Sequence, residues 1–481
     1  MAYITGADKN QMMLIGYSID EFIDKDNIAR VIEAYVNKLD LEDMGFEIYS
    51  AEAAGQRPYD RKELLKLHIY GYMNGIRSSR KLETETHRNI EVKWLLGMLE
   101  PDHRTIANFI KDNKRAMKSV LKDFSMLLKE WGLIDGKKVV PDGTKIRAQN
   151  SKKAHLSIKK IDDTVKYLEN KIEEYIGEME KAEEAAATIN EAIKKEELNK
   201  IEDKIKEYRQ RAESYKETKK EMEEKGISQV TLTDPDSRMM RNNGRMEVCY
   251  NMQIVVDSKN KLIMDCDVVN EVTDQGQLGN MVNKASEILG EKPETVLADT
   301  GYYKGEEITK CEEDHIKVYI KKQKSKNSTG NERYSVDNFK YTKEEDKYVC
   351  PEGKTLEYAG KGRDRGTEVT RYKCEECNDC PEAKECTTSK AGRTVARKEY
   401  QDILDEVNKR TMENKELYRE RQCIVEHPFG TLKRNLGFTY FLRKGLEAVN
   451  AEGALMSLAY DLKRAVNILG IQGIISKIEA I

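Results

Sequence analysis

The sequence predicts a mixed α/β core that is preceded by an all-helical N-terminal domain and interrupted by two inserted segments. Three observations lead to this expectation. Apolar residues recur at helical spacing up to about residue 136, and alternating patterns typical of strands follow residue 226. A long proline-free stretch and a cysteine-rich stretch separate the blocks of the core. A chain of 481 residues is long enough for about two to four domains.

The composition is typical of a chain with a large solvated surface. Charged residues make up 35% of the chain, and the formal net charge is −3. No apolar run approaches the ~18 residues that a membrane helix needs. The first ten residues also lack the basic and then apolar order of a signal peptide. We therefore expect a cytoplasmic protein that does not bind a membrane.

Residues 1–136 are expected to form the helical N-terminal domain. Apolar side chains at helical spacing over Leu64–Ile69 indicate one helix. Ser78 and Asp102 are candidate N-caps of two further helices, because their side-chain oxygens can accept hydrogen bonds from the first free N–H groups. This part of the chain is therefore predicted to be a group of short helices joined by tight turns.

The N-terminal helices carry an excess of positive charge. Residues 57–123 contain 15 Lys and Arg against 9 Asp and Glu. A local basic surface attracts phosphate groups whatever the net charge of the whole chain. Short helices with Arg104 and its basic neighbours at one end suit a helix-turn-helix module that binds DNA. A plain helical bundle with a solvated basic face is the alternative that the spacing leaves open.

The core is expected to contain alternating strands and helices. Val139 and Val140 precede Asp142 in one short strand, and two strands joined by a turn follow at residues 246–269. A helix, a strand that ends at Asp299, a second helix and the strand IKVYI come next. The core is accordingly expected in three pieces, residues 137–156, 227–320 and 396–481.

Two segments interrupt this core. Residues 157–226 contain no proline, and their apolar residues keep a heptad spacing from Ile158 to Met179. A single helix of that length would reach ~100 Å, so a coiled-coil helical hairpin is the better interpretation. Its role is expected to be structural or interactive. Residues 321–395 are polar and rich in glycine and lysine, which indicates a small second insert.

Three acids are candidate catalytic and metal-binding residues. Asp142 and Asp299 each end an apolar run and precede a glycine within two residues. Acids at strand ends of an open α/β sheet lie where such sheets bind ligands. Two carboxylates would suit Mg²⁺, and Glu426 could supply a third. Each acid alone has a plain alternative: a turn former for the aspartates, and for Glu426 an acid at a helix start with Pro428 in the first turn.

The order of these blocks resembles the DDE-class transposases of bacterial insertion sequences. The resemblance covers roughly residues 57–469. It implies an RNase H-like catalytic core in which Asp142, Asp299 and Glu426 bind Mg²⁺ or Mn²⁺. It also implies an endonuclease and strand-joining activity in DNA recombination, with the terminal inverted repeats and target DNA as double-stranded partners, and at least a homodimer. The matching blocks are RPYDRKELLKLHIYGYMNGIRSSRKLE, VVPDGTKIRAQNSK, DPDSRMMRNNG, VCYNMQIVVD, VLADTGYYKGEE and RQCIVEHPFGTLKR.

The residues around Glu426 follow the pattern of many relatives with one departure. Those relatives show Tyr, two residues, Arg, three residues, Glu, six residues and Lys. Here Tyr418, Arg421, Glu426 and Lys433 fit, except that four residues separate the arginine from the glutamate. The resemblance implies that Arg421, Lys433 and Arg434 bind DNA phosphates. The longer spacing makes Arg421 the least secure of these contacts.

Five of the nine cysteines lie close together. In a cytoplasmic chain such clustering indicates a metal site rather than disulfides, and four thiolates complete a structural Zn²⁺ site. A reduced, metal-free loop and an iron–sulfur cluster are the alternatives. The remaining cysteines, Cys249, Cys266, Cys311 and Cys423, are expected to be buried packing residues. Four of the following five are expected to bind the zinc ion: Cys350, Cys374, Cys377, Cys380 and Cys386.

Three functions are consistent with these features. The leading hypothesis is a DNA transposase that cuts element ends and joins them to target DNA. A non-catalytic DNA-binding or architectural protein, such as a domesticated transposase, would use the same helices and inserts without cleavage. A metal-dependent nuclease would use the same acids with water as the only nucleophile. Joined DNA products separate the first function from the other two.

Overall fold

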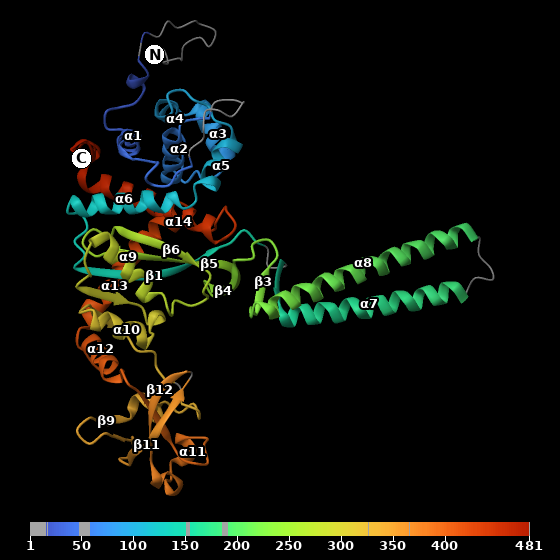
Figure 1. The fold of residues 1–481 in the computed structure, drawn as a ribbon, viewed down its shortest axis with the longest axis vertical. Helices are drawn as coiled ribbons and strands as arrows, with labels where there is room; N and C mark the ends of the chain where they lie inside the picture. Colours follow the sequence, from blue (N-terminus) through green and yellow to red (C-terminus); the bar gives the residue numbers. More distant parts are fainter. Residues whose placement is uncertain are drawn as a thin grey trace, which may run out of the picture.

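The computed structural model arranges the chain as a column with one long side arm (Figure 1). N-terminal helices lie at one end, a mixed sheet with its helices in the middle, and a second sheet at the other end. In the part of the chain that is described, no helix is both long and apolar enough to cross a membrane. The described residues are 16, 18–47, 58–150, 154–184, 191–325, 327–364 and 366–480.

The N-terminal helices form as the sequence predicts. Asp102 caps α5, because its side chain accepts hydrogen bonds from the backbone N–H groups of Arg104 and Thr105. Ser78 precedes α3 but makes no capping hydrogen bond through its side chain. The helices are α1 (Ile28–Lys38), α2 (Arg61–Met73), α3 (Ser79–Arg88), α4 (Ile90–Leu95), α5 (His103–Asp112) and α6 (Ala116–Glu130).

The central sheet is mixed, with order β4-β5-β1-β7-β8 and with β6 also paired to β5. β5 is antiparallel to β1, β4 and β6, whereas β7 runs parallel to β1 and to β8. These directions make the core a mixed α/β structure. The strands are β1 (Lys138–Arg147), β4 (Arg238–Asn242), β5 (Arg245–Asp257), β6 (Ile263–Val269), β7 (Thr295–Ala298) and β8 (Lys317–Ile320).

The expectation that Asp142 ends a strand is wrong. β1 continues to Arg147, because its pairing with β5 runs on to Cys249 after the parallel pairing with β7 has ended. Asp142 therefore lies inside a long strand whose second half has β5 as its neighbour. Asp299, in contrast, directly follows the last residue of β7, as expected.

Helices cover the sheet and connect it to the N-terminal end. α14 (Leu446–Leu469) is buried along most of its length and packs against β6, α6 and α2. α15 (Ile471–Glu479) packs against α1, so the C-terminal and N-terminal parts share one core. The other helices near the sheet are α9 (Leu278–Leu289), α10 (Gly305–Glu313), α12 (Gln401–Glu413) and α13 (Lys415–Gly430).

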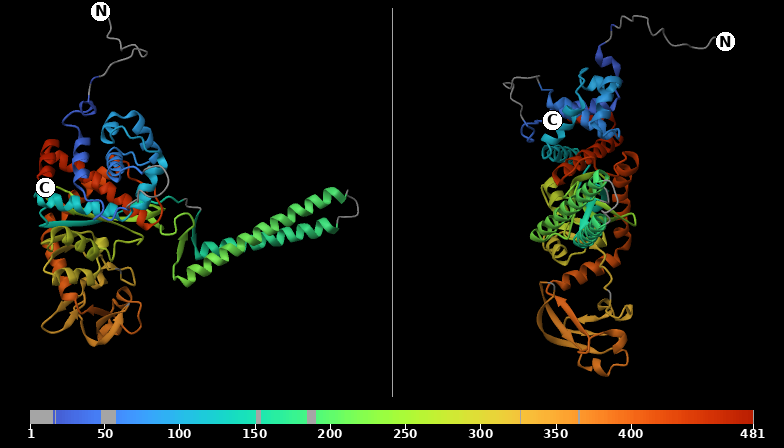
Figure 2. Two further views of the ribbon diagram at one scale, coloured as in Figure 1. Left: turned by 45° about the horizontal axis from the view of Figure 1, so that its top comes forward. Right: turned by 90° about the vertical axis from the view of Figure 1, so that its right-hand side faces the viewer.

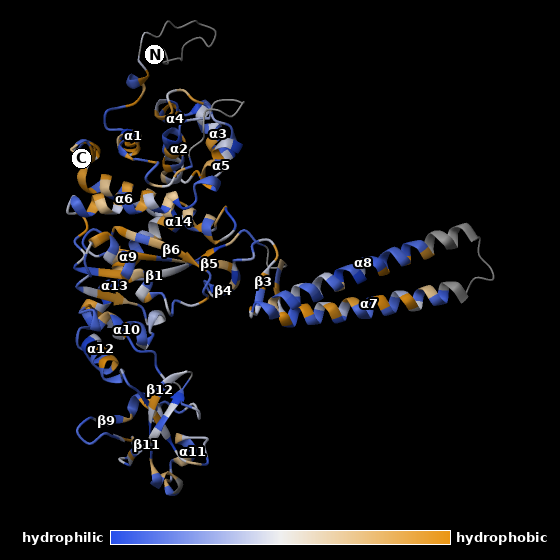
Figure 3. Ribbon diagram, in the orientation of Figure 1, coloured by the Kyte–Doolittle hydropathy of each residue, from blue (hydrophilic) through white to orange (hydrophobic). Residues whose placement is uncertain are grey.

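The side arm consists of two antiparallel helices, α7 (Ile158–Glu184) and α8 (Glu191–Glu224). The left view of Figure 2 shows it projecting away from the sheet, and the right view looks along it from its tip. Ion pairs cross between the helices, such as Lys219 to Asp162 at 2.7 Å and Lys216 to Glu169 at 2.9 Å. The arm is mostly hydrophilic on its surface, whereas hydrophobic residues gather in the central sheet (Figure 3). A two-stranded ribbon joins it to the core, β2 (His155–Ser157) and β3 (Gln229–Thr231).

A second sheet, here called the insert sheet, lies between β8 and α12 in the sequence. Its order is β13-β12-β11-β10-β9, and all of its neighbouring strands are antiparallel. It has a small core of its own, which contains tyrosines and two of the cysteines. Its strands are β9 (Lys340–Thr342), β10 (Lys347–Val349), β11 (Thr355–Asp364), β12 (Thr367–Lys373) and β13 (Thr394–Lys398).

Candidate active site

Asp142 and Asp299 lie close together at the sheet. β1 and β7 are adjacent, with Val139 paired to Val296. The guanidinium of Arg421 contacts both carboxylates: Nη2 is 3.1 Å from Asp299 Oδ1, and Nη1 is 3.9 Å from Asp142 Oδ2. Arg421 belongs to α13. Two strands and one helix therefore contribute to a single cluster of charges.

The protein around Asp142 disfavours its ionised form. Only 22% of its side chain is exposed, and burial raises the pKa of the carboxyl to about 6. The positive charge of Arg421 lowers this pKa, while the negative charges of Asp299 and Asp274 raise it further. A cation that approaches this largely buried carboxyl group therefore stabilises its ionised form.

Asp274 is a third acid of the cluster that sequence reasoning missed. Its Oδ1 atom accepts from Asn251 Nδ2 at 2.8 Å, from Gln253 Nε2 at 2.9 Å and from Lys145 Nζ at 3.1 Å. These donors come from β5 and β1, so they hold the loop before α9 against the sheet. The lysine and the two amides satisfy the hydrogen-bonding capacity of Asp274 Oδ1. The carboxylates of Asp142 and Asp299 have fewer such donors.

Two glycines allow the acids to approach one another. A Cβ atom on Gly143 would lie 2.7 Å from Asp274 Oδ1, and one on Gly301 would lie 3.3 Å from Asp274 Oδ2. Asp274 is itself followed by a glycine two residues later, as Asp299 is. Asp274 thus carried only the glycine half of the signal that selected Asp299, because no apolar run precedes it.

Tyr302 is buried next to this cluster. Its hydroxyl donates a hydrogen bond to the side-chain oxygen of Gln253, the residue whose amide binds Asp274. Burial raises the pKa of Tyr302 well above its usual value, and the nearby charges of Asp142, Asp274 and Asp299 add to this effect. The phenol therefore remains protonated and orients Gln253.

Glu426 does not join the two aspartates. It is exposed, and its carboxylate makes no hydrogen bond or ion pair with any described residue. It follows Arg421 by five positions in a continuous α-helix, which turns it about 140° around the helix axis; four positions would turn it only about 40°. Among the described residues, no group of three or more His, Cys, Asp or Glu is placed to hold a metal ion.

The alternative in which Glu426 lies at a helix start is wrong. α13 begins at Lys415, and Pro428 lies within its last turn. A π-helical turn, Thr431–Asn435, follows directly and carries Lys433. Proline lacks the N–H group that donates an α-helical hydrogen bond, so Pro428 favours the change from α-helix to π-helix that follows it. Glu426 and Lys433 are therefore not carried by one regular helix.

Like Arg421, Lys433 lies near the aspartate cluster, whereas the predicted DNA contacts Arg434 and Arg104 are exposed. Its Nζ donates to the hydroxyl of Thr144, two residues after Asp142 on β1. Burial lowers the pKa of Lys433, and the charge of Asp142 opposes this shift. Arg434 is exposed beside it, and Arg104 is exposed near the start of α5.

The cysteines of the insert sheet gather around one small cavity. The cavity measures about 20 Å³, which is room for about one water-sized species. Cys374 lies next to it: burial raises the pKa of its thiol to about 11, and a hydrogen bond with Cys377 adds to the shift. All nine cysteines are free, and Cys423 is exposed on α13, so the expectation that it is buried is wrong. The cavity is lined by Cys350, Cys377, Cys380 and Cys386.

Comparison with known proteins bears on both ends of the chain. The family model described as Transposase DDE domain matches residues 349–466, which include the cysteine cluster, α13 and most of α14. The model described as Transposase domain (DUF772) matches residues 17–112, the N-terminal helices. No curated protein and no solved structure gives a significant match.

Both matched families are transposase families, and the mixed α/β core with its helical N-terminal domain is compatible with that function. The two matches together support an insertion-sequence DDE transposase.

Proposed function

We propose that this transposase binds the terminal inverted repeats of its element, cleaves the ends, and joins the 3′-OH to target DNA. The observation that carries the proposal is the convergence of Asp142 and Asp299 on the guanidinium of Arg421. An RNase H-like core is supported by the strand order β6-β5-β1-β7-β8, in which three antiparallel strands continue into two parallel ones.

The aspartate pair fits a divalent cation by the chemistry of its donors. Mg²⁺ and Mn²⁺ prefer oxygen ligands, and two carboxylates already share one positive charge here. We assign Asp142, Asp299 and Glu426 as catalytic and metal-binding residues, with Glu426 as the acid that must turn toward the pair. A bound metal ion would stabilise charge on the attacking and leaving oxygens of the phosphoryl transfer.

The chain's own cations would position the DNA. Lys433 lies beside Asp142 and can bind a phosphate next to the reacting one, with exposed Arg434 behind it. Arg421 pairs with both carboxylates, and it would be free to bind a phosphate if a metal ion took its place there. Arg104 and the basic N-terminal helices would bind the repeat, and a homodimer would hold two ends together.

The proposal is tested by strand transfer. Duplexes that carry the element's ends, taken from the DNA beside the gene, are incubated with a target plasmid and Mg²⁺. Asp142→Asn, Asp299→Asn and Glu426→Gln should each reduce joined products at least about 100-fold, since charge stabilisation at the reacting phosphate is lost. Asp314→Asn, a surface acid, is the matched control. Full joining by Asp299→Asn would refute the assignment.

The same assay separates the other candidate functions. A non-catalytic DNA-binding protein would retain the end duplexes without cutting them, with or without metal. A nuclease would release cut ends but form no joined products.

We also propose that the cysteine cavity binds a structural Zn²⁺. Four cysteines line one small cavity, which favours Cys350, Cys377, Cys380 and Cys386 over sets that include Cys374. The four thiols are not yet placed to hold a metal ion, so they would have to move together around it. Metal analysis of the purified protein tests this assignment. About one zinc per chain is expected, which Cys377→Ser should abolish and Cys423→Ser should leave intact. A zinc-free wild-type protein would refute it.

A further inference from the structure

A lysine follows the strand that neighbours Asp299. β7 and β8 are parallel, and Ala298 is paired with Ile320. Asp299 and Lys321 come directly after these paired residues, so they leave the sheet at the same edge, on strands about 4.8 Å apart. Gln323 Nε2 also donates to the carbonyl oxygen of Thr300 at 3.4 Å. Residues 321–324, here called the basic linker, thus start beside a candidate catalytic acid.

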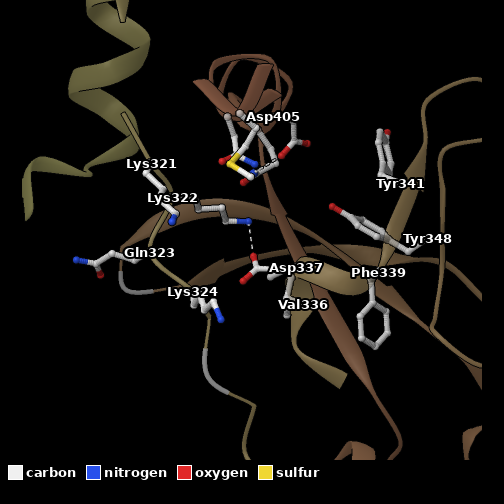
Figure 4. A pocket seen from close by; sticks show the side chains of 14 residues that line it. Lys321, Lys322, Gln323, Lys324, Val336, Asp337, Phe339, Tyr341, Tyr348 and Asp405 are labelled. Carbon is white, nitrogen blue, oxygen red and sulfur yellow. Dashed lines mark hydrogen bonds and ion pairs between the residues drawn. The ribbon is translucent and has the colours of Figure 1, made fainter. Parts of the chain in front are cut away.

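The basic linker forms one wall of a pocket that the insert sheet and α12 also line (Figure 4). The pocket has a volume of about 440 Å³. Lysines line it on the linker side, and aromatic rings of the insert sheet line it opposite. The residues that form these two walls are Lys321, Lys322, Lys324, Phe339, Tyr341 and Tyr348.

The acids of this pocket are already neutralised. Asp337 pairs with Lys322 at 2.7 Å, the contact drawn in Figure 4. Asp405 accepts from Arg397 Nη1 at 3.0 Å. The acidic wall groups therefore do not cancel the charge of the other lysines of the linker.

Two lysines of the linker remain available to a ligand. Lys321 is exposed and makes no ion pair with any residue in the described ranges. Lys324 lies 3.8 Å from Glu332, but its side chain is 84% exposed, and pairs of this kind contribute little stability. The two lysines are three residues apart, at most about 10 Å of chain. This span matches the rise of about three nucleotides in one DNA strand.

We propose that Lys321 and Lys324 bind phosphates of the DNA strand that runs from the catalytic edge toward the insert sheet. The ligand class is a phosphodiester backbone, and the contact is sequence-independent. This inference rests on the proposed function and extends it by naming a path for the DNA. The insert sheet then acts as a wall that guides DNA past Asp299.

The salt dependence of DNA binding tests this inference. The full chain is titrated with an element-end duplex in buffer without added Mg²⁺ or Mn²⁺, to prevent cleavage, at several salt concentrations. Each lost phosphate contact should reduce the slope of log affinity against log salt by about 0.9. Lys321→Ala/Lys324→Ala should thus lower it by about 1.8, and the corresponding double arginine variant should restore it. Lys361→Ala, at an exposed β11 position outside the pocket, should leave the slope unchanged.

A double alanine variant with the wild-type slope would overturn the inference. Thermal unfolding of each variant confirms that the exposed substitutions leave the fold intact. If the wild-type protein bound no duplex at all, the proposed function would fail together with this inference. A wild-type protein that binds DNA while the double variant keeps its slope would refute the inference alone.

Discussion

Replacing Arg77 should weaken the junction between the N-terminal helices and the core. Arg77 lies between α2 and α3, and its Nη1 atom donates to Glu452 Oε1 of α14 at 2.8 Å and to the carbonyl oxygen of Tyr440 at 2.7 Å. The side chains of Arg77 and Glu452 are only 6% and 0% exposed. Arg77→Ala leaves Glu452 buried with backbone donors alone, those of Leu442 and Arg443.

The expected cost follows from this burial. Removing one partner of a buried ion pair destabilises a protein by about 3–5 kcal/mol, because the remaining charge stays desolvated. Burial already raises the pKa of Glu452 even with Arg77 beside it. The loss of stability in Arg77→Ala should therefore be smaller at pH 5 than at pH 8, since a proton can neutralise the unpaired Glu452 at the lower pH.

Urea unfolding followed by circular dichroism at both pH values measures this loss. The matched variant is Arg77→Met/Glu452→Gln, which removes both charges and should cost less than Arg77→Ala. The reasoning is refuted if Arg77→Ala costs less than about 1 kcal/mol at pH 8, or if the double variant is as unstable as the single one.

Three further predictions follow from single sites. Asp461 is fully buried, the Ile263 N–H is its only hydrogen-bond donor among the described residues, and burial raises its pKa well above the usual value. Its folded form holds a proton that the unfolded chain releases, so the free energy of unfolding should fall by up to about 1.4 kcal/mol per pH unit above about pH 4, and Asp461→Asn should remove this slope in urea titrations. Gly143→Ala places a Cβ 2.3 Å from Gln253 Nε2, so strand transfer should fall at least about 10-fold with a stability loss of about 1–3 kcal/mol, whereas Gly279→Ala, with nothing within 4 Å, should retain activity. Chelation of zinc should increase amide hydrogen exchange in the insert sheet but not in β5, because the sheet has a separate small core.

Local patterns were sufficient to predict much of the fold. The alternation over residues 246–269 and the apolar runs before Asp142 and Asp299 predicted β5, β6, β1 and β7, because strand burial repeats every two residues. The proline-free stretch likewise predicted the paired helices α7 and α8. Which strands are neighbours, and so which acids meet, depends on long-range pairing that a local pattern does not record.

The misses at the site have the same origin. The direction in which Glu426 points depends on how α13 is rotated about its axis, and this helix begins eleven residues earlier, at Lys415. The same rotation exposes Cys423. Asp274 also precedes a glycine, but it lies on a loop. Its position beside the sheet follows from its hydrogen bonds with the side-chain amides of β5, which the local sequence does not show. The contact of Arg421 with both aspartates was not predicted, because the motif suggested a phosphate as its partner.

The central claim is that Asp142 and Asp299 form the metal site whose charge Arg421 neutralises in the absence of metal. Electron paramagnetic resonance during a Mn²⁺ titration of the full chain measures it directly, without DNA or turnover. The wild-type protein should bind Mn²⁺, and Asp142→Asn/Asp299→Asn should lose this binding. Arg421→Ala should bind Mn²⁺ more tightly than the wild-type protein. Equal Mn²⁺ binding by the wild-type protein and the double aspartate variant would contradict the central claim.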